Sequence, residues 1–149
     1  MTIRPPSPPS NASRCLDLVG LMGLLRITLF ESFGDRKYWD EHYYDLFMSM
    51  LAKQLRGSVS TLEEMTSSMT GISQSTKIRM IEEARKDGHI IALNRSQIEL
   101  DGPLGNIGAR KVFFLSEATL ASMCHSLTEM IDDVDAFARA DSRPEPTTG

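Results

Sequence analysis

The 149-residue sequence contains little of what disulfide-rich and metal-binding proteins need. It has only two cysteines, Cys15 and Cys124, which lie far apart and outside any Cys-x-x-Cys or Cys/His spacing. We therefore expect neither a disulfide framework nor a zinc site, and inert buried thiols are the simplest prediction. The three histidines, His42, His89 and His125, are too widely spaced for a recognised metal motif, so no metal or other cofactor is expected.

Long uncharged apolar runs are also missing. The most apolar stretch, residues 15–33, is interrupted by Asp17, Arg26 and Glu31, which leaves no uncharged span of about 20 residues. The N-terminus is a Pro/Ser tract rather than a basic segment that leads into an apolar run, so no signal peptide is predicted. We expect a cytoplasmic protein without a membrane segment.

Motifs of enzyme active sites are absent from the sequence. There is no nucleophile elbow, and the glycines at 102, 105 and 108 do not follow a strand-to-helix transition as a nucleotide-binding loop requires. The adjacent Asp132 and Asp133 fall on the polar face of a predicted helix, where solvation explains them. The sequence therefore predicts no catalytic residues and no enzyme.

The charge is low but unevenly distributed. The net charge is −4, yet nine Lys and Arg residues stand against seven Asp and Glu residues between Lys53 and Lys111. From Val112 onward the balance is two against seven. With 41% hydrophobic residues, the chain can build one core, and its middle is the part suited to an anionic partner.

The N-terminal third predicts an arm and two helices. Residues 5–13 carry four prolines with serine and asparagine and favour no regular structure, and the tail from residue 142 is similar. Over 16–30 apolar side chains occupy every face, which predicts a helix that a second copy of the chain covers. Residues 44–55 predict an amphipathic helix ending near Gly57, with a buried stripe of Tyr44, Phe47, Met48, Leu51 and Leu55.

The next segment predicts two helices joined by a glycine turn. Ser60 and Glu63 have the spacing of a capping box and open a short helix, which Gly71 breaks. The inward-facing residues of this short helix are expected to be Leu62, Met65 and Met69. Ser73 can cap a second helix that stops at Gly88. Its buried stripe is expected to be Ile78, Ile81 and Ala84.

Beyond residue 89 the pattern becomes extended. The runs 90–93, 98–100 and 111–115 favour strands, and 101–108 is rich in glycine and proline, so we predict a long-looped β-hairpin. Ser116 then caps a helix of about five turns. Its apolar residues recur every three or four positions: Leu120, Met123, Leu127, Met130, Ile131, Val134 and Phe137.

This order of elements points to nucleic acid, because two helices joined by a tight turn are a recurrent DNA-reading device. The leading turns of the second helix contain two cations, no acid and several short hydrogen-bonding side chains: Ser73, Gln74, Ser75, Thr76, Lys77 and Arg79. Such side chains can contact base edges and phosphates, and a helix N-terminus favours a phosphate nearby. The acidic Glu82, Glu83 and Asp87 come later, on the part expected to leave the DNA. Arg85 and Lys86 are expected to pair with Glu82 and Glu83 on a solvated face.

Two motifs resemble the MarR family of winged-helix regulators. The run TGISQST at 70–76, followed by KDGHI at 86–90, is similar to the helix-turn-helix of that family. The run ARKVFFLSEA at 109–118 resembles its wing strand and the start of its C-terminal helix. The resemblance covers 45–121. It departs at Lys77, where the family commonly has an apolar residue, which suggests a rotated helix with Ile78 buried. The acid-x-Arg pair of the family's wing is also missing before Arg110.

The resemblance implies an α+β, mostly α fold, a winged helix-turn-helix with N- and C-terminal dimerisation helices. It divides the chain into a disordered arm over 1–14, dimerisation and support helices over 15–56, the winged helix-turn-helix over 57–116, a C-terminal dimerisation helix over 117–141 and a disordered tail over 142–149. Residues 73–77 and Arg79 would enter the major groove. Arg95, Arg110 and Lys111 would touch phosphates from the hairpin, or they simply keep the hairpin soluble.

Relatives in this family bind small aromatic ligands between the dimer helices and the DNA-binding module. The resemblance places the corresponding residues of this chain at Arg26, Tyr38, Trp39, His42 and Tyr43. Some relatives also use cysteines as peroxide sensors, which is the alternative to inert thiols for Cys15 and Cys124.

The sequence thus predicts a DNA-binding transcriptional regulator, a repressor that acts as a homodimer on double-stranded DNA with a pseudo-palindromic operator. The alternative is a winged-helix module for protein interaction or assembly that does not touch DNA.

Overall fold

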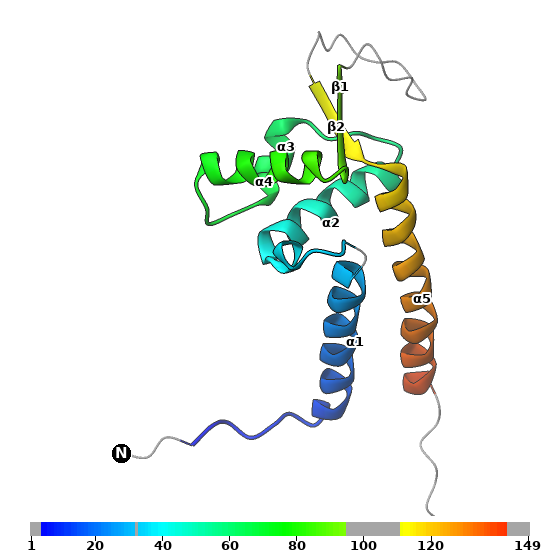
Figure 1. The fold of residues 1–149 in the computed structure, drawn as a ribbon. Coiled ribbons are helices and arrows are strands. Elements are labelled where there is room, and N and C mark those ends of the chain that lie inside the picture. The colour runs from blue at the N-terminus through cyan, green and yellow to red at the C-terminus, as the bar shows by residue number, and fades with distance from the viewer. Residues whose placement is uncertain (1–3, 32, 95–110, 143–149) are drawn as a thin grey trace, which may run out of the picture.

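The protein is mostly helical, with one small antiparallel sheet (Figure 1). The computed structural model describes residues 4–31, 33–94 and 111–142. The elements follow in the order α1 (Ala12–Glu31), the 3-10 helix η1 (Arg36–Trp39), α2 (Glu41–Leu55), α3 (Leu62–Ser68), α4 (Gln74–Lys86), β1 (Ile90–Asn94), β2 (Lys111–Leu115) and α5 (Glu117–Ser142). The predicted α+β, mostly α class is confirmed.

The first and last helices, α1 and α5, lie side by side and extend away from the rest of the molecule (Figure 1). Near their far ends Arg14 joins them. Its Nη1 donates a hydrogen bond to the carbonyl oxygen of Phe137 at 2.9 Å, and its guanidinium carbon lies 3.6 Å from the centroid of the Phe137 ring. The hydrogen bond and the cation–π contact hold the two helices together near their far ends.

Helix α1 begins earlier than the sequence suggested. Its first residue is Ala12, so residues 12–14, predicted as part of a disordered arm, are helical. The last proline of the tract is Pro9, and a proline restricts only its own conformation and that of the residue before it. The proline tract therefore does not prevent the residues from Ala12 onward from forming a helix.

The main core lies where α2 meets α3, α4 and the sheet. Its largest almost fully buried side chains come from seven elements and from the C-cap of α3: Leu29, Phe30, Tyr38, Leu46, Phe47, Met50, Leu51, Met65, Met69, Ile81, Ile90 and Leu115. Figure 1 shows that α2 passes beneath α3, α4 and the two strands, which explains why this helix contributes most to the core. The core therefore sits under the α3–α4 pair and holds it from one side.

The two strands form an antiparallel pair, as predicted for the hairpin, and the sheet has one extra partner. Strands β1 and β2 pair antiparallel, with Ile90 opposite Leu115 and Asn94 opposite Lys111. Ser60, in the loop between α2 and α3, also pairs with Phe113 through two backbone hydrogen bonds of 2.9 and 2.8 Å. This bridge fixes the start of α3 against the sheet. The third predicted strand, 98–100, lies outside the described residues.

The capping box of α3 is one residue later than predicted. The N-cap is Thr61, whose hydroxyl accepts from the Glu64 backbone N–H at 3.2 Å, while a Glu64 carboxylate oxygen accepts from the Thr61 N–H at 3.1 Å. The predicted pair, Ser60 and Glu63, is wrong because the backbone of Ser60 is held in the bridge to Phe113. Lys53 of α2 forms an ion pair with the same Glu64 carboxylate, so the cap also ties α3 to α2.

Several predicted burial positions are also corrected. Three apolar residues expected in the core are exposed: Leu55 by 60%, Leu62 by 39% and Ile78 by 40%. In α2 the buried stripe is Tyr43, Leu46, Phe47, Met50 and Leu51, and in α4 it is Met80, Ile81 and Ala84. Both helices are thus rotated relative to the predicted stripe, because α2 packs against α3 and β2 while α4 packs against α3 and β1.

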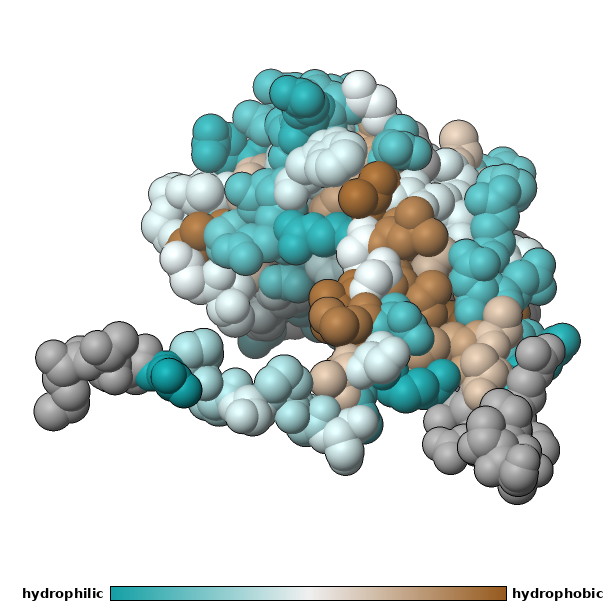
Figure 2. Space-filling view, turned by 90° about the horizontal axis from the view of Figure 1, so that it is seen from below, coloured by the Kyte–Doolittle hydropathy of each residue, from teal (hydrophilic) through white to brown (hydrophobic). Residues whose placement is uncertain are grey.

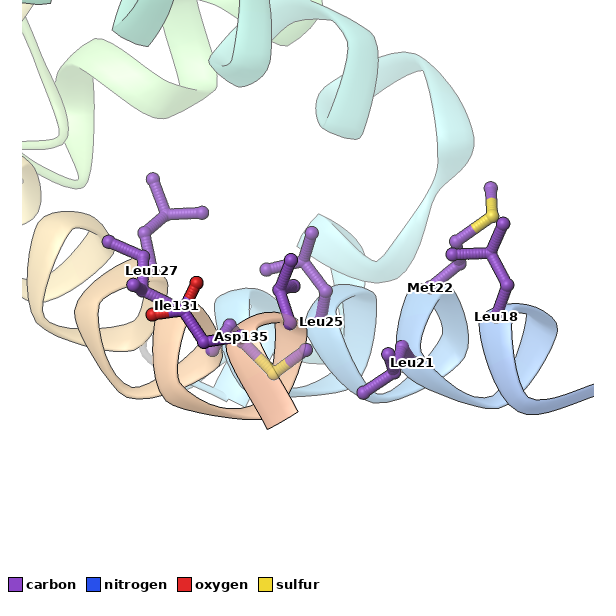
Figure 3. A pocket seen from close by; sticks show the side chains of 9 residues that line it. Leu18, Leu21, Met22, Leu25, Leu127, Ile131 and Asp135 are labelled. Carbon is purple, nitrogen blue, oxygen red and sulfur yellow. The ribbon is translucent and has the colours of Figure 1, made fainter. Parts of the chain in front are cut away.

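An apolar face runs along α1 and α5. Eight of the twelve large hydrophobic side chains exposed in the described residues belong to these two helices: Leu16, Leu18, Val19, Met22, Leu24, Ile27, Ile131 and Val134. Figure 2, a view from below, shows apolar side chains gathered on this side of the molecule. Between the helices lies a groove of about 550 Å³ whose lining is apolar except for Asp135 (Figure 3). Patches of this kind mark interaction surfaces in soluble proteins.

Candidate nucleic-acid interface

The α3–α4 pair is joined by a short turn whose geometry depends on glycine. Gly71 has a φ of +83°, a left-handed conformation that side chains with a Cβ rarely adopt. Ser73 follows in extended conformation and caps α4, with its hydroxyl accepting from the Thr76 N–H at 3.3 Å. The turn therefore ends one helix and starts the next within five residues, as the sequence predicted.

The N-terminal end of α4 exposes a cluster of hydroxyls and cations. The Ser73 hydroxyl lies 2.8 Å from that of Thr76 and 3.2 Å from that of Ser75. Gln74, Ser75 and Arg79 are exposed, whereas Thr76 and Lys77 are partly buried. No acidic residue stands in the first turn of the helix. These side chains, predicted as one group, therefore share one accessible helix end that is suited to an anionic, hydrogen-bonding ligand.

The opposite end of α4 carries its acids and engages them within the protein. Glu82 accepts from Arg85 at 2.8 Å, the i,i+3 pairing on a solvated face that was predicted for Arg85. Asp87 at the C-cap is bound by the Lys37 ammonium at 2.6 Å and by the Tyr38 hydroxyl. The hydrogen bonds from Lys37 and Tyr38 hold the pKa of the Asp87 carboxyl below its ordinary value. The helix is thus basic at the end that follows the turn and neutralised at the other.

Two tyrosines hold α4 from below. The Tyr43 hydroxyl lies 3.0 Å from the Met80 carbonyl oxygen and 3.1 Å from a Glu83 carboxylate oxygen, so it donates its proton between these two acceptors. The Tyr38 hydroxyl reaches Asp87 two turns further along. Burial is the main reason that the pKa of each phenol lies above its ordinary value, so both remain protonated donors. Together they define the position of α4 along its length.

His89 packs among the same aromatic side chains. Its ring centroid lies 4.9 Å from that of Phe33, 5.0 Å from that of Tyr38 and 6.2 Å from that of Phe47, each in an edge-on arrangement. Its Nδ1 is 2.9 Å from the Thr119 hydroxyl of α5. Burial lowers the pKa of His89, and the nearby Asp87 carboxylate only partly opposes this effect. A neutral imidazole therefore joins the α4 end to α5.

No protein-family model, curated protein or solved structure matches this chain. The MarR resemblance therefore rests on the two motifs alone.

The predicted hairpin contacts are only partly placed. Lys111 is exposed at the first position of β2. Arg95 and Arg110 lie outside the described residues, as do the glycines predicted for the hairpin loop. Of the nine residues predicted to contact DNA, six thus cluster at the N-terminal end of α4 and one lies on the sheet.

The five predicted ligand-binding residues are divided between the core and the surface. Tyr38 and Tyr43 are exposed by 0% and 3%, and their hydroxyls already bond to α4. Trp39 is exposed by 44%, and its carbonyl oxygen accepts from the Arg26 guanidinium at 3.4 Å. His42 Nδ1 lies 2.8 Å from an Asp40 carboxylate oxygen. The ligand stays a prediction, and in this structure the two tyrosines serve to position α4.

The remaining expectations concern metals, thiols and membranes. Among the residues that the structure describes, no cluster of His, Cys, Asp and Glu side chains could hold a metal ion. Cys124 is partly buried, but Cys15 is exposed on α1, so the prediction of two buried thiols is wrong for Cys15 in the single chain. None of the helices within the described ranges is long and apolar enough to cross a membrane.

Sequence reasoning missed the role of Tyr38 and Tyr43 in positioning α4. The Tyr43 bond to Met80 spans 37 residues and the Tyr38 bond to Asp87 spans 49. No local pattern carries such pairings, because they depend on how α2 and η1 pack under α4. The only local signal was an excess of tyrosines. Three fall within residues 38–44, which is more than one amphipathic stripe needs.

Proposed function

We propose that this protein is a winged helix-turn-helix transcriptional regulator that binds DNA as a homodimer. The observation that carries the proposal is the N-terminal end of α4, which follows a tight glycine turn, has no acid in its first turn and exposes hydroxyls, an amide and an arginine. In this reading α3 supports α4, α4 enters the major groove, and the β1–β2 hairpin is the wing. The two motifs that resemble the MarR family support the same reading.

Dimerisation is the second part of the proposal. The apolar face of α1 and α5 is too extensive for an isolated monomer, and a second copy would bury it in an isologous interface. A two-fold dimer would present two α4 helices to successive major grooves about 34 Å apart. The operator would accordingly be pseudo-palindromic, and its occupation would repress transcription.

The test is enrichment of bound sequences from a pool of random duplex DNA, at low and at moderate salt. A DNA-binding regulator should select a palindromic motif. Its affinity for that motif should fall steeply with salt, because each neutralised phosphate contributes about −0.9 to the slope of log K against log salt concentration. If no sequence is enriched at either salt concentration, the proposal is wrong and a protein-interaction module becomes the better reading.

A pair of charge variants makes this test specific to α4. Arg79→Gln removes the exposed cation of the candidate interface, whereas Arg36→Gln removes an exposed cation of η1, on the side where α4 ends. Both change the net charge equally. We expect Arg79→Gln to weaken operator binding by about tenfold per half-site, within the range of one lost arginine contact. Arg36→Gln should change it little, and equal losses in the two variants would argue against α4 as the reading element.

A further inference from the structure

Ile78 is an apolar side chain on the outer face of α4. It is exposed by 40%, while Met80, Ile81 and Ala84 on the inner face are exposed by 6% or less. Helical spacing places Ile78 one turn after Ser75 and next to Arg79, both of which are exposed. The outer face of α4 therefore presents a serine hydroxyl, an isoleucine side chain and a guanidinium group within about one turn.

The isoleucine gains little from this position within the single chain. β-branched residues lose side-chain freedom in a helix, so Ile78 is not there for helix propensity. It is also not among the hydrophobic residues packed against the core. A single exposed isoleucine is ordinary on a protein surface, but this one stands between hydrogen-bonding groups on the helix face that would lie against base edges.

We propose that Ile78 contacts the 5-methyl group of a thymine in the major groove and so specifies a T·A pair at one position of each half-site. This inference rests on the proposed function. Thymine is the only unmodified base that presents a methyl group in that groove. A cytosine at the same position carries only a hydrogen at C5, where thymine has its methyl group, so the isoleucine would lose this contact. Ser75 and Arg79 can meanwhile hold the helix by hydrogen bonds to neighbouring groups.

The decisive experiment removes the methyl group from the DNA and the isoleucine from the protein in turn. In the enriched operator, each thymine of one half-site is replaced singly by deoxyuridine, which changes only the methyl group. One position should weaken binding of the unmodified protein about fourfold, the effect of about one buried methyl group. Ile78→Ala should bind the thymine operator at least about fourfold more weakly, and it should no longer distinguish thymine from deoxyuridine at that position.

A matched control is available on the neighbouring helix. Leu62 of α3 is exposed by 39%, close to the 40% of Ile78. Leu62→Ala removes a similar exposed apolar side chain and should retain the full fourfold response to deoxyuridine. Alanine has a higher helix propensity than isoleucine, so Ile78→Ala should remain folded. A thermal unfolding measurement would verify this.

The outcomes separate this inference from the proposed function. If an operator is enriched but no thymine responds to loss of its methyl group, the Ile78 inference is overturned while DNA binding stands. The Ile78 inference is also overturned if Ile78→Ala still distinguishes thymine from deoxyuridine. If Ile78 serves only a protein partner, neither the unmodified protein nor Ile78→Ala should distinguish the two bases. Failure to enrich any operator overturns both proposals.

Discussion

At the scale of single residues, His89 links protonation to stability. It packs edge-on against three aromatic rings and lies beside Thr119, and burial lowers its pKa below the ordinary value of 6.5. The unfolded chain therefore binds a proton more readily than the folded one. Because the unfolded state gains the proton first, stability should be complete above about pH 6.5 and should fall as the pH drops from there toward the lowered folded value.

This pH dependence can be measured by urea unfolding at pH 7.5 and 5.5. We expect the unmodified protein to lose stability between these values and His89→Gln to lose less, because glutamine does not titrate. The carboxyl of Asp87 titrates below this window, since its pKa is lowered from 3.8, and it does not contribute to the difference. An identical pH dependence in both proteins would contradict the assignment to His89.

At the scale of elements, the start of α3 offers a direct comparison of two neighbouring residues. The Thr61 hydroxyl caps the helix, whereas the Ser60 side chain is buried and makes no hydrogen bond to the residues that the structure describes. Thr61→Ala should lower the free energy of unfolding by about 1 kcal/mol. Ser60→Ala should leave it nearly unchanged, since its pairing with Phe113 uses backbone atoms only.

The same pair shows what sequence could and could not predict about the elements. The segment contains two overlapping Ser/Thr-x-x-Glu patterns, at 60–63 and 61–64, and nothing local decides between them. The choice follows from the bridge between Ser60 and Phe113, a contact across 53 residues of chain that holds Ser60 extended. If Ser60→Ala proved the more destabilising change in chemical denaturation, the start of α3 would have to be reassigned.

Elements with strong local signals were predicted closely. The bounds of β2 agree to the residue, because a β-branched and aromatic run is flanked by polar positions, and α4 is delimited by Ser73 and Gly88 as expected. The candidate site was predictable for the same reason, since nearly all of its residues are consecutive at the start of one helix. The rotation of α4, which exposes Ile78, was not predictable because Tyr43 and Tyr38 set it from distant elements.

At the scale of the whole molecule, a net charge of −4 has to be reconciled with the anionic partner that we propose. An acidic protein can bind DNA only if its positive charges are gathered on one side and its acids are engaged elsewhere. The neutralisation of Glu82 by Arg85 and of Asp87 by Lys37 meets this need along α4. A dimer would increase this separation of charge, because two such helix ends would face the same duplex while the acidic α5 helices would lie farther from the DNA.

The dimer itself can be tested by placing a charge on the apolar face. Met22 of α1 is exposed by 63% and lines the groove beside α5, so a single chain in water should tolerate Met22→Glu. In a dimer the same carboxylate would be buried without a partner, which costs several kcal/mol and should raise the dissociation constant by about 100-fold or more. Leu55, exposed by 60% at the end of α2, provides the control Leu55→Glu, with equal charge and similar exposure outside this face. Sedimentation equilibrium should give a dimer for the unmodified protein and Leu55→Glu, and a monomer for Met22→Glu. Operator affinity should fall with the dimer, because one α4 can contact only one half-site. A Met22→Glu protein that remains dimeric would mean that two copies meet through another surface, and the spacing of half-sites expected from α1 and α5 would then no longer hold.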